Sequence, residues 1–283
     1  MTDDAWAALA EPFLDGAYAT VKGRVRTFVL HQQLLAHLPD PPATVLDIGG
    51  GGAQQSLPLA RLGFEVTVLD PSAAMLAKAE QRLDVEPTAV QRRVKLIQGA
   101  GEDAARITAG TEFAAVLCHG VLMYLERPEP MVRAMCGCAA PGGVVSIMTL
   151  NARTLAIRPA LEGRWADASA AFDATHEVGV LGTDTRGDTV EHLSTLLRSN
   201  DVTPQDWYGV WLFSDWLDLP PEHTNVAEVA NVELQASRRD PYRQVSRAFH
   251  LVGRRAGGYG RRPEKGLLSS AASLIPGPRI VGR

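Results

Sequence analysis

The chain has 283 residues, of which 46% are hydrophobic and 21% are charged, and its formal net charge is −4 at pH 7. This length and apolar content allow a sizeable buried core within one compact domain. No run approaches the roughly 18 apolar residues of a membrane-spanning helix, and the N-terminus has no apolar run of signal-peptide type. We therefore predict a cytoplasmic protein without a membrane partner.

The cysteines and the charge distribution indicate whether the protein binds metal ions or RNA. Cys118, Cys136 and Cys138 form no metal-ligand pattern, and their odd number and C-x-C spacing are typical of reduced thiols, so we predict no metal. Residues 231–283 carry eleven Lys or Arg against three acids, a local charge of +8 that leaves −12 for the remainder. Such a basic stretch permits contact with RNA phosphates, and it is equally typical of a solvated face and a basic tail.

Residues 45–52, Val-Leu-Asp-Ile-Gly-Gly-Gly-Gly, are typical of a strand that opens into a nucleotide-binding turn. Gly49, Gly50 and Gly51 would let the backbone approach a ligand and adopt positive φ. A dinucleotide fingerprint needs a further glycine, and glutamine stands at both places where it would fall, residues 54 and 55. Asp47 instead suits a ligand that carries an ammonium group. S-adenosyl-L-methionine carries such a group on its methionine half.

A second acid supports this cofactor. Residues 66–70 form a short apolar run that ends in Asp70, 19 residues after Gly51, where an acid at the end of a second strand can hold a ribose diol. NAD enzymes use the same device. Together with the glycine turn and the helix start after Asp70, the pattern resembles the class I S-adenosylmethionine-dependent methyltransferases.

Strands and helices continue to alternate along the chain. After Asp70 we predict a helix over residues 72–83, strands over 94–98, 113–118 and 144–148, a turn over 99–103, a helix over 129–138 and a tight turn over 141–143. Residues 152–187 break the rhythm and indicate an insertion that covers the site. The last third predicts helices over 189–199 and 227–236 and strands over 207–213 and 248–253.

These elements predict a Rossmann-like α/β fold. The sheet would have seven strands, mostly parallel with one antiparallel strand, and helices on both faces. Residues 1–255 would form a single domain, and residues 256–283, in which Gly, Pro, Ser and Arg dominate, would form a disordered basic tail. No particular oligomeric state is predicted.

Three segments outside the glycine turn resemble one family, the bacterial tRNA 5-carboxymethoxyuridine methyltransferases. They are Tyr18-x-Thr20-x-Lys22-Gly23-x-x-Arg26, the pair Asn151-Ala152, and Asp240-Pro241-Tyr242 followed by Arg247 and His250. With the glycine turn, the similarity spans residues 6 to about 255. The resemblance implies methylation of the carboxylate of 5-carboxymethoxyuridine at the tRNA wobble position, with the anticodon loop as partner.

The resemblance also implies roles for individual residues. Arg26 matches the family arginine that contacts the carboxylate of the cofactor, a pairing that suits a guanidinium fork. Gly101 and Glu102 would border the adenine, while an acid there would stabilise a helix N-terminus in any case. His119 would lie beside the methyl-bearing sulfur, or it is a histidine of the core. A base is not required, because a carboxylate is already ionised at neutral pH.

The residues expected at the substrate are Tyr18, Lys22, Asn151, Trp211, Tyr242 and Arg247. Two positions depart from the family pattern: Trp211 stands where an arginine is expected on the sixth strand, and Ala19 replaces a glycine. Trp211 can stack on a base of a single-stranded loop, but it cannot pair with a carboxylate, and a buried aromatic residue is the plainer interpretation. Two alternatives stay open: a methyltransferase for a small carboxylic acid or other metabolite, and a catalytically silent module that binds the cofactor.

Overall fold

The computed structural model describes residues 18–179 and 182–257, and it forms a helix-flanked sheet. The strands of this sheet are β1 (Thr44–Ile48), β2 (Glu65–Asp70), β3 (Val94–Gln98), β4 (Phe113–His119), β5 (Ala139–Leu150), β8 (Val202–Val210) and β9 (Ala248–Arg255). Their order in space is β3-β2-β1-β4-β5-β9-β8. The first five run parallel, and β9 runs antiparallel to both of its neighbours, β5 and β8. The seven-stranded sheet with one antiparallel strand is therefore confirmed.

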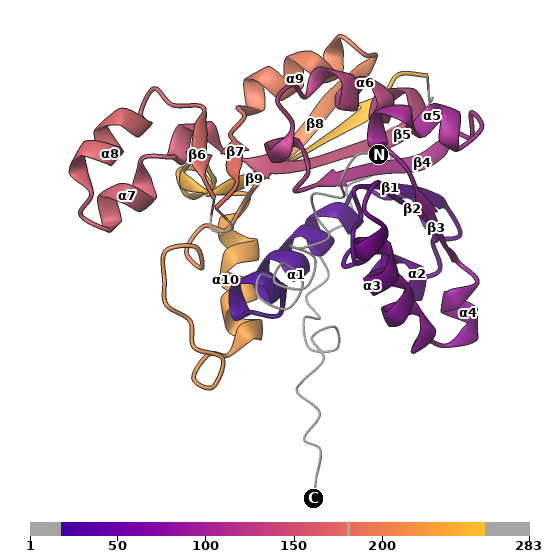
Figure 1. The fold of residues 1–283 in the computed structure, drawn as a ribbon, viewed down its shortest axis with the longest axis horizontal. Coiled ribbons are helices and arrows are strands. Elements are labelled where there is room, and N and C mark those ends of the chain that lie inside the picture. The colour runs from indigo at the N-terminus through magenta and orange to yellow at the C-terminus, as the bar shows by residue number, and fades with distance from the viewer. Residues whose placement is uncertain (1–17, 180–181, 258–283) are drawn as a thin grey trace, which may run out of the picture.

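Helices cover both faces of the sheet (Figure 1). One layer consists of α1 (Val21–Leu35), α2 (Ser56–Arg61), α3 (Ala73–Asp84) and α4 (Thr88–Gln91). The other consists of α5 (Ala104–Ile107), α6 (Glu129–Cys138) and α9 (Val190–Arg198), while α10 (Val226–Ala236) packs beside α1. Polar side chains fix several helix starts: Thr20, Ser72 and Thr189 each accept a backbone N–H three residues on.

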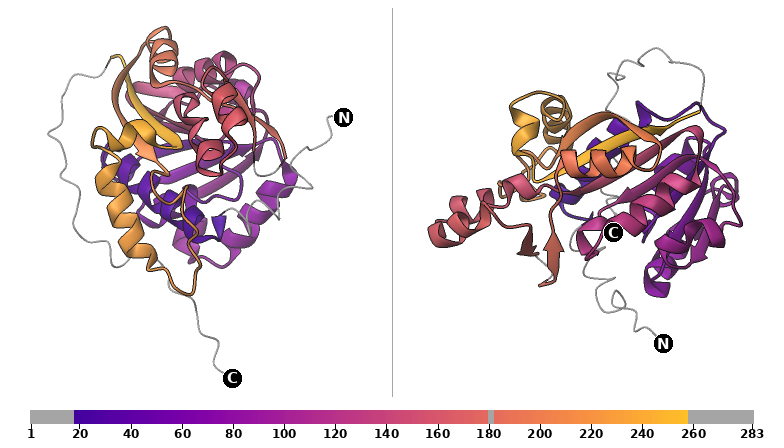
Figure 2. Two further views of the ribbon diagram at one scale, coloured as in Figure 1. Left: turned by 90° about the vertical axis from the view of Figure 1, so that its left-hand side faces the viewer. Right: turned by 90° about the horizontal axis from the view of Figure 1, so that it is seen from above.

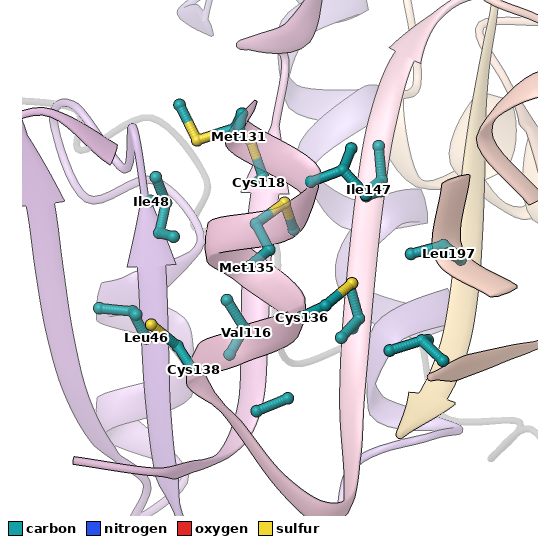
Figure 3. Packing of buried hydrophobic residues seen from close by; sticks show 14 of the residues in the cluster. Leu46, Ile48, Val116, Cys118, Met131, Met135, Cys136, Cys138, Ile147 and Leu197 are labelled. Carbon is teal, nitrogen blue, oxygen red and sulfur yellow. The ribbon is translucent and has the colours of Figure 1, made fainter. Parts of the chain in front are cut away.

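The core consists of two apolar layers, one on each face of the sheet. Figure 3 shows Met131, Met135 and Cys136 of α6 packed against side chains of the central strands, which include Leu46, Ile48, Val116, Cys118 and Ile147. All three cysteines are free and buried. Within residues 18–179 and 182–257, no helix combines the length and apolar character needed to cross a bilayer.

The insertion contains two short helices and a hairpin: α7 (Ile157–Leu161), α8 (Trp165–Ala171), β6 (His176–Val178) and β7 (Asp184–Arg186). The helices α7 and α8 project from the body of the molecule (Figures 1 and 2). Short 3-10 turns complete the fold: η2 (Gly101–Asp103), η3 (Leu122–Tyr124), η4 (Ala152–Thr154) and η5 (Tyr242–Val245).

Two predicted boundaries were wrong. The strand expected over residues 207–213 is β8, which runs from Val202 to Val210 and ends because Trp211 adopts a left-handed backbone with φ 57°. The turn expected over residues 141–143 lies inside β5, where the register against β4 shifts and Gly142 has φ 72°. The tail expected over 256–283 falls almost entirely outside the described residues.

Candidate active site

The site lies at the carboxyl edge of the parallel strands, where the strand order reverses between β1 and β4. Ligands of open α/β sheets bind at such a switch point, because loops from the two strands diverge there. A small cavity at this edge is lined by Tyr18, Arg26, Asp47, Gly49, Gly50, Gln54, Gln55 and His119. A larger cavity lies at the opposite edge, near the amino ends of β1 to β4, away from these residues.

The glycine turn needs glycine for two separate reasons. Gly49 and Gly51 have φ of 68° and 50°, a left-handed conformation that side chains disfavour. A Cβ at Gly50 would lie 2.8 Å from the carboxylate of Asp47 and 2.9 Å from Val68. The two glutamines that replace the dinucleotide glycine line the cavity themselves. The turn therefore brings bare backbone against the cavity.

Asp47 is a buried carboxylate at the end of β1. Its Oδ2 accepts a hydrogen bond of 2.6 Å from the Ser56 hydroxyl. Burial, and to a smaller extent the negative charge of Asp70, raise the pKa of Asp47 to about 6, against the opposing effect of the hydrogen bond from Ser56. A cationic group in the cavity would favour the ionised form of Asp47.

Asp70 connects the two loops at this edge. Its Oδ2 accepts from the backbone N–H of Gly51 at 2.9 Å, and its Oδ1 accepts from the N–H of Ser72 at 2.9 Å. A carboxylate has about four lone-pair positions and can accept more than two hydrogen bonds. The acid that the sequence assigned to a ribose thus also holds the glycine turn in place.

Arg26 places a buried guanidinium beside the glycine turn. The side chain comes from α1, and its Cζ lies 4.9 Å from the ring centre of Tyr18 and 5.4 Å from that of Trp211. Its Nε is buried and has no hydrogen-bond partner among the described residues. An unpaired buried N–H costs free energy, so this position is complementary to an anionic ligand group.

These groups fit S-adenosyl-L-methionine. Arg26 can hold a carboxylate, Asp47 an ammonium, the glycine turn can approach the ligand with its backbone, and Asp70 can accept from ribose hydroxyls. No group of three His, Cys, Asp or Glu suited to a metal ion gathers in residues 18–179 and 182–257.

Gly101 and Glu102 lie in η2, beyond β3. Gly101 is buried, and a Cβ there would collide with Ile48 and lie 2.6 Å from Met131, so close packing alone requires glycine at this position. Glu102 is exposed. Neither residue lines the small cavity that contains Arg26 and Asp47.

His119 ends β4 and lines the cavity. Burial lowers the pKa of His119 to about 3, and the positive charge of Arg26 contributes to the shift. Its Nε2 lies 2.8 Å from the Ser146 hydroxyl, which in turn lies 2.7 Å from Nε2 of His250. The residue is therefore a neutral imidazole and not a proton acceptor at neutral pH.

Cationic side chains from three parts of the chain converge on Asp215. Lys22 of α1 forms an ion pair with Asp215, and Arg158 of α7 pairs with the same carboxylate at 2.7 Å. Arg247 lies 3.9 Å from Asp215 and pairs with Glu177 of the insertion. We call Lys22, Arg158 and Arg247 the cationic cluster. Burial, with a smaller contribution from the nearby charge of Arg158, lowers the pKa of Arg247 to about 10.

Trp211 contacts both Lys22 of the cationic cluster and Arg26, which lines the cavity. Its ring is 5.1 Å from Nζ of Lys22, and its indole N–H donates to the carbonyl of Lys22 at 3.3 Å. The turn after it is held by the buried Glu233 of α10, whose carboxylate accepts three consecutive backbone N–H groups, those of Leu212, Phe213 and Ser214, at 2.9, 2.8 and 2.6 Å. Trp211 is thus fixed by backbone geometry as well as by packing.

Asn151 and Tyr242, both expected at the substrate, lie in different surroundings. Asn151 is buried, donates to the carbonyl of Ser246 at 3.1 Å and accepts from the N–H of Arg153, so its amide holds two loops together. Tyr242 is 48% exposed and stacks edge-on with Phe213 at 6.0 Å. The structure thus gives Asn151 a structural task and leaves Tyr242 accessible.

Most of the described basic residues of the last segment make internal contacts. Arg254 donates to the carbonyls of Gly142 and His37. Arg255 donates to main-chain carbonyls, and Arg243 pairs with Asp240. Arg238 and Arg239 are exposed.

The comparisons with known proteins point to a methyltransferase. Residues 46–147, which contain the glycine turn and Asp70, match a family model described as a methyltransferase domain. The tRNA 5-carboxymethoxyuridine methyltransferase of Escherichia coli O157:H7 is 27% identical over 259 residues, which cover 90% of this chain and 97% of that protein. The chain is an S-adenosylmethionine-dependent methyltransferase.

Other similar proteins have names that indicate different substrates. A ubiquinone biosynthesis O-methyltransferase of Caulobacter vibrioides is 36% identical over 125 residues, which cover 42% of this chain and 45% of that one. The magnesium protoporphyrin IX methyltransferase of Synechocystis PCC 6803, solved with bound SAH, aligns with a TM-score of 0.56 at 15% identity, covering 83% of this chain and 86% of that chain. At that identity the structural likeness shows the fold alone.

Several residues of the site carried no signal in the sequence. Arg158 and Glu177 lie in the insertion, and Asp215 follows β8, so only the folded chain brings them to Lys22. Gln33 is one of two adjacent glutamines in α1, a helix with several polar residues, so the sequence does not single it out. Ser146 lies in the apolar strand β5, and a polar residue in such a strand was the one available clue.

Proposed function

We propose that the methyltransferase forms the methyl ester of 5-carboxymethoxyuridine at the wobble position of tRNA, or esterifies a closely related acidic uridine. The observation that carries the proposal is the cationic cluster of Lys22, Arg158 and Arg247 beside Trp211. The ring of Trp211 also lies 5.4 Å from Arg26 of the cofactor cavity. Three cations face two carboxylates there, so the cluster keeps a net positive charge for an acidic substrate group. The likeness to the Escherichia coli enzyme over 90% of the chain supports the same substrate class.

The cluster also supplies an arginine that could pair with a substrate carboxylate, although position 211 holds a tryptophan. Arg158 of the insertion brings a guanidinium to the neighbourhood of Trp211 from a different element. Trp211 and Tyr18 add aromatic faces on which an unstacked base can rest. Exposed Arg238, Arg239 and Tyr242 would extend the contact to an RNA backbone. A tRNA substrate would place the enzyme in the cytoplasm.

Methyl transfer to a carboxylate requires the protein mainly to bind and orient the two reactants. S-adenosyl-L-methionine, when bound, supplies an electrophilic methyl group. A substrate carboxylate is ionised at neutral pH and has no proton to lose, which agrees with the low pKa of His119. The cationic cluster would orient the carboxylate, and Arg26 with Asp47 would orient the methionine half. The surrounding aromatic rings would exclude water.

The deciding assay measures transfer of labelled methyl to two tRNA preparations, one that carries 5-carboxymethoxyuridine and one that lacks the carboxymethoxy group. Transfer to the first alone supports the proposal. Transfer to neither contradicts it, and transfer to small aromatic or aliphatic carboxylic acids instead would favour a metabolite methyltransferase.

A variant assay tests the cationic cluster itself. Arg158→Gln should raise the KM for the acidic tRNA by about tenfold or more, because a charge-assisted hydrogen bond contributes roughly 1.5–3 kcal/mol. Its affinity for the cofactor should stay unchanged. The matched control is Arg164→Gln on the same insertion, where the arginine is about half exposed and pairs with Glu162. Equal KM values for both variants would remove Arg158 from the substrate site.

A further inference from the structure

A chain of buried polar side chains runs from α1 through the sheet to the cofactor cavity. Gln33 of α1 donates to the carbonyl of Gly209 at 3.1 Å, and its Oε1 lies 3.0 Å from Nδ1 of His250. The Ser146 hydroxyl then joins Nε2 of His250, at 2.7 Å, to Nε2 of His119, at 2.8 Å. None of the four side-chain residues is more than 8% exposed. The chain is therefore almost completely shielded from bulk water.

The direction of every hydrogen bond in this chain follows from its first member. A backbone carbonyl can only accept, so the Gln33 nitrogen must face Gly209 and its oxygen must face His250. Nδ1 of His250 therefore carries the proton. Nε2 of the neutral ring then accepts, which makes Ser146 a donor to His250 and an acceptor from His119. His119 is consequently protonated at Nε2 and bare at Nδ1.

Two of the cavity residues, His119 and Arg26, each have a buried nitrogen that lacks a partner in the described part of the chain. Nδ1 of His119 is buried and has no hydrogen-bond partner among the described residues, and the same holds for Nε of Arg26. Both residues line one cavity, so a donor-rich cation and an acceptor lone pair lie at the same site. This combination is complementary to an amino acid group, whose carboxylate needs donors and whose ammonium needs acceptors. Burial lowers the pKa of both histidines, which keeps the two rings neutral.

We propose that Gln33, His250 and Ser146 are positioning residues that hold His119 as its Nε2–H tautomer, so that Nδ1 accepts a hydrogen bond from the ammonium group of S-adenosyl-L-methionine. Asp47 lines the same cavity and can accept from another N–H of the ammonium. The inference rests on the cofactor and not on the tRNA substrate. An ammonium has three N–H groups, which two acceptors do not exhaust.

The first test needs no variant. Nitrogen NMR of the histidine-labelled protein without ligand should show one tautomer for His119, with the proton on Nε2, and His119→Asn assigns the signal. A proton on Nδ1 in the wild-type protein would overturn the proposal, because that nitrogen could then no longer accept.

The second test compares two ligands by calorimetry: S-adenosylhomocysteine and the analogue that lacks its amino group. Ser146→Ala should weaken binding of S-adenosylhomocysteine about tenfold, while the affinity of the deaminated analogue should change by less than about twofold. Restoring the hydroxyl as Ser146→Thr should recover most of the loss. Equal weakening of both ligands by Ser146→Ala would mean a general distortion of the cavity and would overturn the proposal.

The matched control is Thr149→Val on the same strand. Thr149 is fully buried, and its hydroxyl has no hydrogen-bond partner among the described residues. Removing it deletes a buried hydroxyl from β5 without touching the chain from Gln33 to His119. Both affinities should match the wild type in this variant. Since all of these measurements omit tRNA, failure of the tRNA assay would leave them unaffected.

Discussion

Arg26 is a buried cation whose Nε has no partner until a ligand arrives. We therefore predict that Arg26→Met weakens cofactor binding by about 10- to 100-fold, since a charge-assisted hydrogen bond contributes roughly 1.5–3 kcal/mol. The free energy of unfolding of the ligand-free protein should not fall, because the substitution also removes an unsatisfied buried N–H.

Calorimetric binding and urea denaturation of the same variant separate these two effects. Arg24→Met is the control, because Arg24 stands on the same helix but does not line the cavity. A variant at position 26 that unfolds more readily and still binds the cofactor normally would assign Arg26 to the core and not to the site.

Asp47 makes the stability of the ligand-free protein depend on pH. Its pKa is about 6 in the folded state and 3.8 for an unperturbed aspartate, so the folded state binds more protons between these values. The stabilisation from this group is complete below about pH 4 and is lost as the pH rises through about 6. The loss amounts to on the order of 3 kcal/mol, because one pKa unit corresponds to about 1.4 kcal/mol.

Urea denaturation across pH 4 to 8 measures this effect. Asp47→Asn should flatten the profile and stabilise the ligand-free protein at pH 7, while it weakens cofactor binding. Ser56→Ala should shift the transition to higher pH, because the Ser56 hydroxyl stabilises the ionised carboxylate. An unchanged profile in both variants would show that Asp47 titrates normally.

At the scale of elements, the insertion is joined to the body of the protein by charge. Arg158 reaches Asp215 from α7, and Glu177 of β6 reaches Arg247 of the body. Asp215 is 1% exposed, so its removal would leave the cationic cluster without its shared partner. Asp215→Asn should destabilise the protein by roughly 3–5 kcal/mol, the usual effect of breaking a buried ion pair.

Limited proteolysis and chemical denaturation would detect this change. Asp218→Asn, an exposed acid three residues on, is the control and should unfold like the wild type. If Asp215→Asn were as stable as that control, the ion pairs would not hold the insertion in place.

Some helices and strands could be predicted from the sequence, and others could not. The parallel strands, the long helices and the cofactor turn were predictable, because apolar runs and the Asp-x-Gly-x-Gly pattern are local signals. The hairpin of β6 and β7 and the end of β8 were not. Trp211 has a left-handed backbone because Glu233, 22 residues later, captures the three following N–H groups. Such long-range contacts leave no periodicity in the sequence.

Some residues of the site could likewise be found from the sequence, and others could not. Asp47, Asp70 and the glycines were found from spacing, and Arg26 from the family resemblance, and the structure gathers all of them at one edge of the sheet. Arg158, Asp215, Gln33 and Ser146 were missed, because each is an ordinary residue of its own segment. The roles of the predicted site residues and the single-domain interpretation of residues 1–255 stay predictions.

For the whole molecule, charge is the property most relevant to a tRNA partner. The net charge of −4 would repel RNA overall, so binding needs local positive surface. Replacing exposed Arg238 and Arg239 by Gln should weaken tRNA binding and lower the slope of log Kd against log salt by about 1.4–1.8, since each phosphate contact contributes about 0.7–0.9.

Binding measured over a series of salt concentrations gives the slope. The control replaces Arg92 and Lys95, two exposed cations near the other end of the sheet, and it should leave the slope as in the wild type. Equal slopes for the two double variants would exclude the segment after α10 from the RNA surface.

The position of β9 has a consequence for how the enzyme is made. This strand comes last among the described strands in sequence, yet it lies inside the sheet between β5 and β8. During translation, β5 and β8 cannot be joined until residues 248–255 leave the ribosome. His250 lies on that strand, so the hydrogen-bond chain to His119 is completed in the same event. A nascent chain that stalls before this strand would carry the glycine turn but not a finished site.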